Sequence, residues 1–312
     1  MTFHLLRAPT MPTSPLDLIL DGLMRRYRER VPAVGGVIDA MIHNGLIQSE
    51  AEIENDHIAF RTMGVPQLGI QSLEKIFLNC GYEKRDHYSF EGKKLDAFWY
   101  SPPQDHYPRI FISELRVRDL SPTAQNIISS YTAEVSSDPV EQLDLNNGQA
   151  VDQFLHSPLW RTPTISDYER LAEESEYAAW VIYNRYYLNH FTISVHNLPA
   201  PFNTIEKFNE LVESSGFRLN NSGGKAKISP DGLLIQSSTV AEMVSAEFDD
   251  GCGGTVGKLI AGSYVEFAER KIKPESAGKT HITRSDRRDG FEANNADKIF
   301  ESTFSTQTTK PN

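Results

Sequence analysis

Two heptapeptides, DHIAFRT at residues 56–62 and NHFTISV at residues 189–195, decide the fold of this chain. Each begins with an acid or an amide, continues with histidine, and then alternates apolar residues with small or polar ones. Alternation with a period of two is typical of a strand that has one face against the protein core. The two segments are therefore predicted to be strands, and their similarity indicates an internal repeat.

The residues that follow each heptapeptide repeat one order of elements. Helices are predicted at 71–78 and 204–212, each ended by a glycine, Gly81 or Gly216. The interval from the histidine to that glycine is 81 − 57 = 24 residues in one half and 216 − 190 = 26 in the other. After the helices, strands are predicted at 82–90, 94–101 and 109–115, and at 225–229, 232–238 and 263–271. We therefore expect an α+β fold in which two βαβββ modules form one sheet system.

The rest of the chain is predicted to surround these modules. Apolar spacing predicts one or two helices between residues 15 and 48, interrupted near Pro32 and at Gly35 and Gly36. The end of the chain is poor in apolar residues, so we expect it to be mobile or laid over the surface. The predicted segments are an N-terminal helical segment 1–50, a first module 51–115, a mainly helical insertion 116–188, a second module 189–272 and a polar C-terminal tail 273–312.

Composition excludes some classes of protein. The 312 residues carry a net charge of −11, which argues against a general nucleic-acid partner or an anionic membrane surface. Two cysteines, Cys80 and Cys252, supply neither a disulfide framework nor a zinc motif, so a reducing cytoplasm fits. No run approaches the ~18 apolar residues of a membrane span. The N-terminus is a poor secretory signal, while an organellar transit peptide stays open.

The strand pattern also points to a metal site. Alternation puts His57 and Arg61 on one face of the first strand, and His190 and His196 on one face of the second. Glu266 lies in the last predicted strand, opposite its apolar neighbours. Two histidines and one carboxylate are the ligand set of non-haem iron oxygenases, which leaves metal positions open for substrate and O2. Strands with a solvent-exposed polar face would show the same alternation.

The repeated module resembles the vicinal-oxygen-chelate superfamily, whose paired βαβββ units build a cupped mixed sheet around a divalent metal. Three segments and the last strand resemble more closely the 2-oxoadipate dioxygenase/decarboxylase family: 56–61 (DHIAFR), 107–115 (YPRIFISEL), 234–238 (LIQSS) and 265–270 (VEFAER). The resemblance covers about residues 15–272. It implies Fe(II)-dependent conversion of a small 2-oxo acid and O2, most concretely of 2-oxoadipate to 2-hydroxyglutarate with loss of CO2.

By this resemblance His57, His190 and Glu266 are the metal ligands and Arg61 binds the substrate carboxylate. Arg61 lies about 13 Å along the strand from His57, at ~3.3 Å per residue, and could hold one end of a short dicarboxylate whose other end chelates the metal. Gln236 and Ser238 are expected to contact the substrate as well. The alternative for Gln236 is that it satisfies buried polar neighbours.

Several residues compete for these roles. His196 is the rival second histidine ligand. Glu114, in the last strand of the first module, is taken as the equivalent of Glu266 and is expected to hold a ligand histidine, to be a remnant of the duplication, or to be an exposed acid. The glycine-rich run 251–258 lacks the residues of a phosphate-binding loop and is expected to be a flexible loop, conceivably a lid.

Two other functions fit the same residues. One is a redox-silent isomerase or lyase of the same superfamily that uses Zn, Ni, Co or Mn. The other is a module that binds a small molecule without chemistry. Turnover that depends on Fe(II) and O2 would distinguish the oxygenase from both. The sequence does not indicate an oligomeric state.

Overall fold

The structure is a computed structural model that describes residues 14–309. The prediction about a secretory signal rests on residues 1–13, which lie outside the described residues. The described chain begins with α1 (Pro15–Arg30) and α2 (Pro32–His43). The break at Pro32 is confirmed, but the predicted break at Gly35 and Gly36 is wrong. Both glycines lie inside α2, where a Cβ on Gly36 would come within 2.4 Å of the Phe217 ring, so Gly36 permits close packing.

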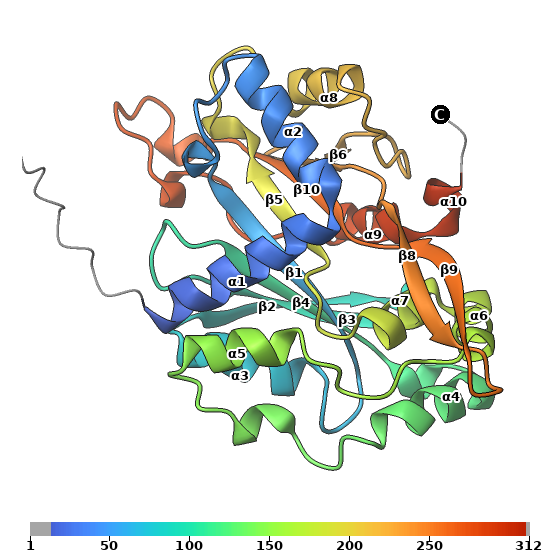
Figure 1. Cartoon of the computed structure of the whole chain (residues 1–312). Helices are drawn as coiled ribbons and strands as arrows, with labels where there is room; N and C mark the ends of the chain where they lie inside the picture. The colour runs from blue at the N-terminus through green and yellow to red at the C-terminus, as the bar shows by residue number, and fades with distance from the viewer. Residues whose placement is uncertain (1–13, 310–312) are drawn as a thin grey trace, which may run out of the picture.

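The two predicted modules are present and join into one mixed sheet, which confirms the α+β fold (Figure 1). The eight strands have the order β2-β3-β4-β1-β5-β10-β7-β6. The pairs β1–β4 and β5–β10 are parallel, and β1 and β5 are antiparallel at the centre, so the two halves repeat one arrangement. The elements of the first module are β1 (Asn55–Met63), α3 (Ile70–Asn79), β2 (Glu83–Phe90), β3 (Leu95–Ser101) and β4 (Arg109–Leu115). Those of the second are β5 (His190–Ser194), α8 (Ile205–Ser214), β6 (Lys227–Ile228), β7 (Leu234–Ser238) and β10 (Tyr264–Arg270).

Helices supply most of the chain between the modules. They are α4 (Pro122–Thr132), α5 (Gly148–Leu155), α6 (Ile165–Glu174) and α7 (Glu176–Asn184). Most of the buried apolar side chains belong to one continuous core, which joins the sheet to α1, α2, α3 and α8. None of the described helices has both the length and the apolar character to cross a bilayer.

The second module contains a hairpin that the sequence did not predict. Strands β8 (Met243–Asp249) and β9 (Thr255–Ala261) form a separate two-stranded sheet. The glycine-rich run is therefore not one flexible loop: residues 251–254 make the turn and the rest begins β9. Gly251 and Gly253 have φ values of 76° and 93°, which favour glycine, so these residues serve the turn.

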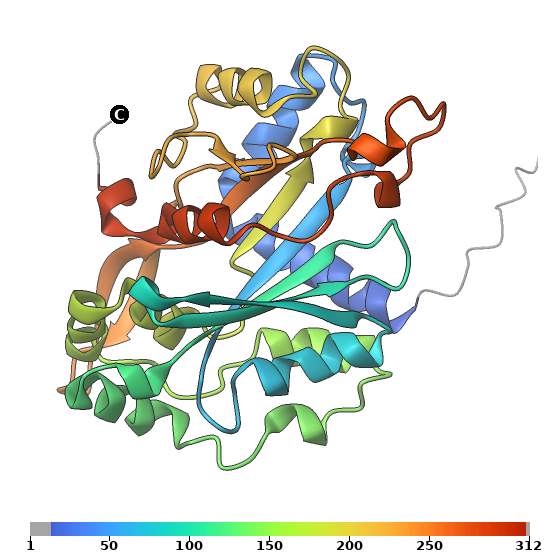
Figure 2. The ribbon, with the colours of Figure 1, turned by 180° about the vertical axis from the view of Figure 1, so that it is seen from behind.

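The C-terminal segment, residues 273–309, is folded against the sheet and is not laid over the outer surface. It forms α9 (Ala293–Phe300) and α10 (Ser305–Thr308), and α9 crosses the cupped face of the sheet, where it contacts β2, β6 and β7 (Figure 2). Phe291, Ile299 and Phe300 of this segment are buried, and buried polar residues such as Asn295 and Ser302 are hydrogen-bonded. The low apolar content of the segment was therefore misleading.

The register of the repeat changes the assignment of Glu114. Arg109 pairs with His57 in the first module and Tyr264 pairs with His190 in the second, so Glu114 is equivalent to Glu269 and not to Glu266. The carboxylate of Glu114 accepts a hydrogen bond of 2.7 Å from the backbone N of Ile70, the first residue of α3. Glu269 does the same for Ile205, the first residue of α8, at 2.8 Å. Both acids therefore cap a helix.

Replacing Glu269 with alanine should lower the free energy of unfolding by about 1–2 kcal/mol, because a buried carboxylate that satisfies a helix N-terminus is lost. Denaturant unfolding measures this change. Glu206→Ala is the matched control, because Glu206 is an exposed acid in the first turn of the same helix. Equal effects of the two substitutions would contradict the capping role.

Candidate metal centre

His57, His190 and Glu266 meet in the interior, at the junction of the two modules. The strands β1, β5 and β10 that carry them are neighbours in the sheet, so the three side chains reach one point on its cupped face. All three are buried, and one ligand atom from each lies within 4.8 Å of the others. The predicted trio is therefore brought together by the fold.

The spacing of the three side chains fits a first-row divalent ion. The Nε2 atoms of the two histidines are 3.3 Å apart. Glu266 Oε1 lies 3.5 Å from His57 Nε2, and Oε2 lies 3.1 Å from His190 Nε2. Ligands at 2.0–2.1 Å from an ion are separated by roughly 3.0 Å at right angles and roughly 3.4 Å at tetrahedral angles. The donor set, two imidazoles and a carboxylate, is also one that binds iron and its neighbours.

The residue before each histidine fixes the orientation of the imidazole ring. His57 Nδ1 donates to Asp56 at 2.8 Å, and His190 Nδ1 donates to the side-chain oxygen of Asn189 at 3.1 Å. These bonds hold the proton on Nδ1, so that Nε2 carries the lone pair that a metal would bind; at His57 the Thr192 hydroxyl lies 3.1 Å from this nitrogen. The acid or amide at the start of each heptapeptide was visible in the sequence, but this role was not assigned to it.

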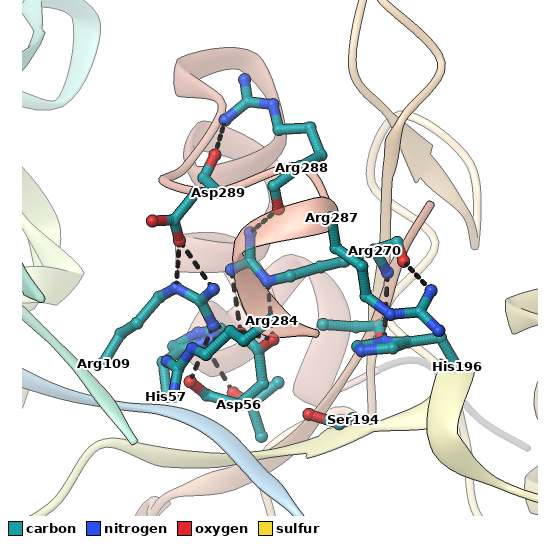
Figure 3. A network of polar contacts seen from close by, with 12 residues as sticks. Asp56, His57, Arg109, Ser194, His196, Arg270, Arg284, Arg287, Arg288 and Asp289 are labelled. Carbon is teal, nitrogen blue, oxygen red and sulfur yellow. Dashed lines mark hydrogen bonds and ion pairs between the residues drawn. The ribbon is translucent and has the colours of Figure 1, made fainter. Parts of the chain in front are cut away.

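Two arginines neutralise Asp56, as Figure 3 shows. Arg270 donates from Nε at 2.6 Å and from Nη2 at 2.9 Å, and Arg109 Nη1 lies at 3.3 Å. Burial raises the pKa of Asp56, but the guanidinium charges of Arg270 and Arg109 outweigh that effect and hold the pKa well below its usual range. Asp56 therefore stays ionised and keeps its hydrogen bond to His57 Nδ1.

The local charges favour a cation among the three side chains. Burial lowers the pKa of His57, but the charge of Glu266 and the bond to Asp56 outweigh it, so the pKa is raised. Burial and the neighbouring His57 together hold the pKa of His190 well below its usual range. The site thus attracts one positive charge and keeps the second imidazole neutral, as a metal ligand must be.

Gln236 orients the carboxylate ligand. Its Nε2 donates to Glu266 Oε1 at 2.7 Å, while its oxygen accepts from Asn295 Nδ2 of α9 at 3.0 Å. The amide therefore satisfies buried polar neighbours, which was the alternative to substrate contact. Ser238 shares a 2.8 Å hydrogen bond with Ser302 and does not line the cavity beside the trio.

Arg61 is buried near Tyr264 and His190 without an acidic partner, although it does not line the cavity beside the trio. Its side chain is 1% exposed, and its guanidinium donates to Thr303 Oγ1 at 2.8 Å and to the carbonyl of Phe300 at 3.0 Å. The rings of Tyr177 and Trp180 lie 5.1 and 5.3 Å from its central carbon. No carboxylate within residues 14–309 forms an ion pair with it. Burial lowers the pKa of Arg61, as expected for a cation without a counter-charge.

His196 does not join the trio. It lies in a 3-10 turn, Val195–Asn197, beyond the end of β5, and its Nδ1 accepts a hydrogen bond from the backbone N of Arg270 at 3.2 Å. Burial lowers its pKa to about 4. Because β5 ends at Ser194, the alternation that put His196 on the face of His190 does not continue to it. The rival ligand thus lies elsewhere, beside Arg270 and Arg287 (Figure 3).

A cavity of about 20 Å³ adjoins the three side chains. Its walls come from both modules and from the C-terminal segment, and the residues that line it are His57, Phe111, His190, Gln236, Tyr264, Glu266, Phe291, Ala296, Ile299 and Phe300. The sequence did not predict the contribution of the C-terminal segment, although the aromatic residues there were a signal. The cavity is apolar apart from the metal-site residues and a few polar groups, which suits chemistry that excludes water.

Comparison with known proteins identifies relatives of this chain. The family model described as 2-oxoadipate dioxygenase/decarboxylase matches residues 19–285. A chloroplastic protein of that name from Arabidopsis thaliana is 46% identical over 265 residues, which span 81% of this chain and 68% of the relative. A chloroplastic/amyloplastic protein of the same name from rice is also 46% identical, over 82% of this chain and 70% of the relative.

Solved structures agree in fold. The crystal structure of the rice hydroxyglutarate synthase in complex with 2-oxoadipate matches with a TM-score of 0.84 and 38% identity, over 98% of this chain and 100% of that one. A glyoxalase-superfamily protein from Ralstonia eutropha matches with a TM-score of 0.71 over 90% of this chain and 88% of that one. Its identity is 19%, so it supports the fold alone.

Replacing Asp56 with asparagine should reduce metal affinity by roughly 10- to 100-fold, because His57 loses the acceptor that orients it. It should also cost about 3–5 kcal/mol of stability, because two buried guanidinium groups lose their shared anion. Metal content and denaturant unfolding measure the two effects. Asp289→Asn is the control, because Asp289 also pairs with Arg109 but is 49% exposed.

The difference in stability between wild type and Asp56→Asn should depend on pH in a definite direction. Because the folded pKa of Asp56 is depressed, its contribution is fully present above the unfolded pKa of about 4 and is lost as pH falls through the lower folded value. The part of the stability difference between wild type and Asp56→Asn that comes from the charge of Asp56 should therefore be lost only below about pH 4. The same carboxylate raises the pKa of His57, so a further part is present at low pH and is lost as pH rises through the folded pKa of His57. A difference that falls as the pH is lowered from about 7 to 5 would contradict a permanently charged Asp56.

Proposed function

The chain belongs to the 2-oxoadipate dioxygenase/decarboxylase family, and we propose that it converts a small 2-oxo acid and O2 by Fe(II)-dependent oxidative decarboxylation and hydroxylation. The substrate that fits best is 2-oxoadipate, with 2-hydroxyglutarate and CO2 as products. One observation carries the proposal: a buried trio of two histidines and a carboxylate shares its interior with an arginine that has no acidic partner. The rice relative, whose structure contains 2-oxoadipate, supports the choice of substrate.

Each residue of the site has a role in this reaction. His57, His190 and Glu266 would hold the ion, and Asp56, Asn189 and Gln236 would keep them in position. When bound, Fe(II) supplies the one-electron chemistry that O2 requires and open positions for the 2-oxo and carboxylate oxygens of the substrate. Arg61 would bind the remote carboxylate in a bidentate contact, which sets the position of the reacting end.

Substrate entry requires movement of side chains. A cavity volume of about 20 Å³ admits a water molecule but not a six-carbon acid. The wall that can yield is the one formed by Ile299 and Phe300, because it belongs to the C-terminal segment and not to the sheet. The same segment would afterwards exclude water from the reaction.

The compartment is also part of the proposal. The cytoplasm fits the cysteine content, and a plastid or other organelle is the alternative that the two plant relatives named as chloroplastic support.

Anaerobic reconstitution with Fe(II), addition of 2-oxoadipate and then a pulse of O2 tests the reaction. We expect consumption of O2, release of CO2 and formation of 2-hydroxyglutarate in equal amounts. Turnover without O2 would favour a redox-silent isomerase or lyase. Binding of 2-oxoadipate by metal-free protein, without turnover on reconstitution, would favour a binding module.

Alanine substitution of His57, His190 or Glu266 should abolish this activity and greatly reduce bound iron, because each removes one of three ligands. Metal analysis after reconstitution and O2 uptake are the measurements. His196→Ala is the matched control, since this buried histidine lies outside the trio. Loss of iron in His196→Ala but not in His190→Ala would move the second ligand to His196.

Arg61→Lys should reduce kcat/KM for 2-oxoadipate by about 10- to 100-fold, because an ammonium cannot make the bidentate contact of a guanidinium. Iron content should stay near wild type. Thr303→Val is the control, because it removes a structural contact of Arg61 and leaves the guanidinium in place. A similar loss of efficiency in Thr303→Val would mean that Arg61 acts by holding the C-terminal segment.

A further inference from the structure

The hydroxyl group of Tyr264 is buried without a hydrogen-bond partner. The residue is 0% exposed, its ring lies in the wall of the metal-site cavity, and its oxygen has no partner within residues 14–309. A buried hydroxyl that makes no hydrogen bond destabilises a protein, so native chains rarely leave one unpaired without a reason. Tyr264, which carries this unpaired hydroxyl, lines the proposed substrate cavity.

The ring of Tyr264 is fixed, so its hydroxyl cannot turn to another partner. The ring stacks on His190, with centroids 4.8 Å apart and planes 30° from parallel. The backbone N donates to the carbonyl of Asn189 at 3.3 Å, and the carbonyl accepts from the Tyr27 hydroxyl. The phenol is thus fixed against the ligand histidine, in the wall of the cavity.

A second unpaired donor lies beside this hydroxyl. Arg61 Nε is also buried without a partner, while the other two nitrogens of the guanidinium donate to the C-terminal segment. The guanidinium lies close enough to the Tyr264 hydroxyl to interact with it, although the two groups do not meet the geometry of a hydrogen bond. The Tyr264 O–H and the Arg61 Nε–H are therefore left over beside each other, and each terminal nitrogen of Arg61 keeps a second N–H that can join Nε in a bidentate contact.

We propose that Tyr264 is a substrate-binding residue whose hydroxyl donates, together with Arg61 Nε, to the substrate carboxylate remote from the metal. The inference rests on the proposed function and adds the group that selects dicarboxylic 2-oxo acids over monocarboxylic ones. A site built to hydrogen-bond a group discriminates strongly against an analogue that lacks it, because its own buried donors then stay unpaired.

Charge balance explains why the second donor is neutral. A divalent ion and Arg61 together carry the positive charge that Glu266 and a dicarboxylate substrate neutralise. Another buried cation would leave the closed site with an excess charge at a large desolvation cost. A phenol adds a hydrogen bond without adding charge, because its neutral O–H is a donor.

The test compares wild type with Tyr264→Phe on two substrates, 2-oxoadipate and 2-oxohexanoate, which has a methyl group in place of the remote carboxylate. For 2-oxoadipate we expect kcat/KM to fall about 10- to 100-fold, mostly through KM. For 2-oxohexanoate we expect no change beyond about twofold. Without substrate, the melting temperature of Tyr264→Phe should be unchanged or higher, because the substitution removes an unpaired polar atom.

Tyr186→Phe is the matched control. Tyr186 is equally buried, but its hydroxyl donates to the carbonyl of Leu68 at 2.6 Å, away from the cavity. This control should lose stability and keep the preference between the two substrates. A lower melting temperature of Tyr264→Phe with an unchanged preference, or an equal loss on both substrates, would overturn the inference.

Anaerobic binding of the two acids to the Fe(II)-loaded protein separates this inference from the proposed function. Binding of 2-oxoadipate that Tyr264→Phe weakens, without O2 uptake by wild type, would refute the proposed reaction and support the role of Tyr264. Equal O2 uptake by wild type and Tyr264→Phe with 2-oxoadipate would support the proposed reaction and refute the role of Tyr264. Failure of wild type to bind 2-oxoadipate at all would refute both.

Discussion

Asp56 carries its negative charge inside the protein, and the groups that neutralise it come from distant parts of the chain. Arg109 extends from β4 and Arg270 from β10, so one carboxylate joins both modules. Arg270 also donates to the carbonyls of Arg288 and Gly290 at 3.0 and 2.8 Å, which ties the C-terminal segment to the same point. Because Asp56 orients His57, this ion-pair network couples the assembly of the fold to the geometry of the metal site.

The two modules repeat the same order of helices and strands, and they differ in the residues at the metal site. Glu114 and Glu269 are equivalent and both cap a helix, which each module needs in order to fold. By the same register Glu266 is equivalent to Phe111, which lines the same cavity. A carboxylate in one module and a phenyl ring in the other give a single metal site with one apolar wall. The asymmetry of the repeat, and not the repeat itself, therefore makes the site.

Much of this arrangement was predictable because it depends on local patterns. Period-two alternation predicted the central strands, and the position of His57 and His190 in equivalent strands predicted that they would meet. The partners of Asp56 were not predictable, because they depend on which distant side chains the closed fold brings together. The C-terminal segment was missed for a related reason: its stability comes from a few well-placed aromatic residues and from hydrogen bonds such as that of Asn295, which composition does not reveal.

Three arginines are among the largest side chains that are fully buried, and they provide a comparison within one molecule. Arg270 has Asp56 as a partner, and although burial lowers its pKa, that carboxylate raises it above the usual value. Arg109 has Asp56 and Asp289, and burial together with the nearby Arg270 lowers its pKa to about 10. Arg61 alone of these three has neutral partners only, and its pKa is lowered by burial. The chain thus supplies counter-charges where an arginine serves the fold, and the exception lies beside the metal site, where a substrate carboxylate would supply the charge that is missing.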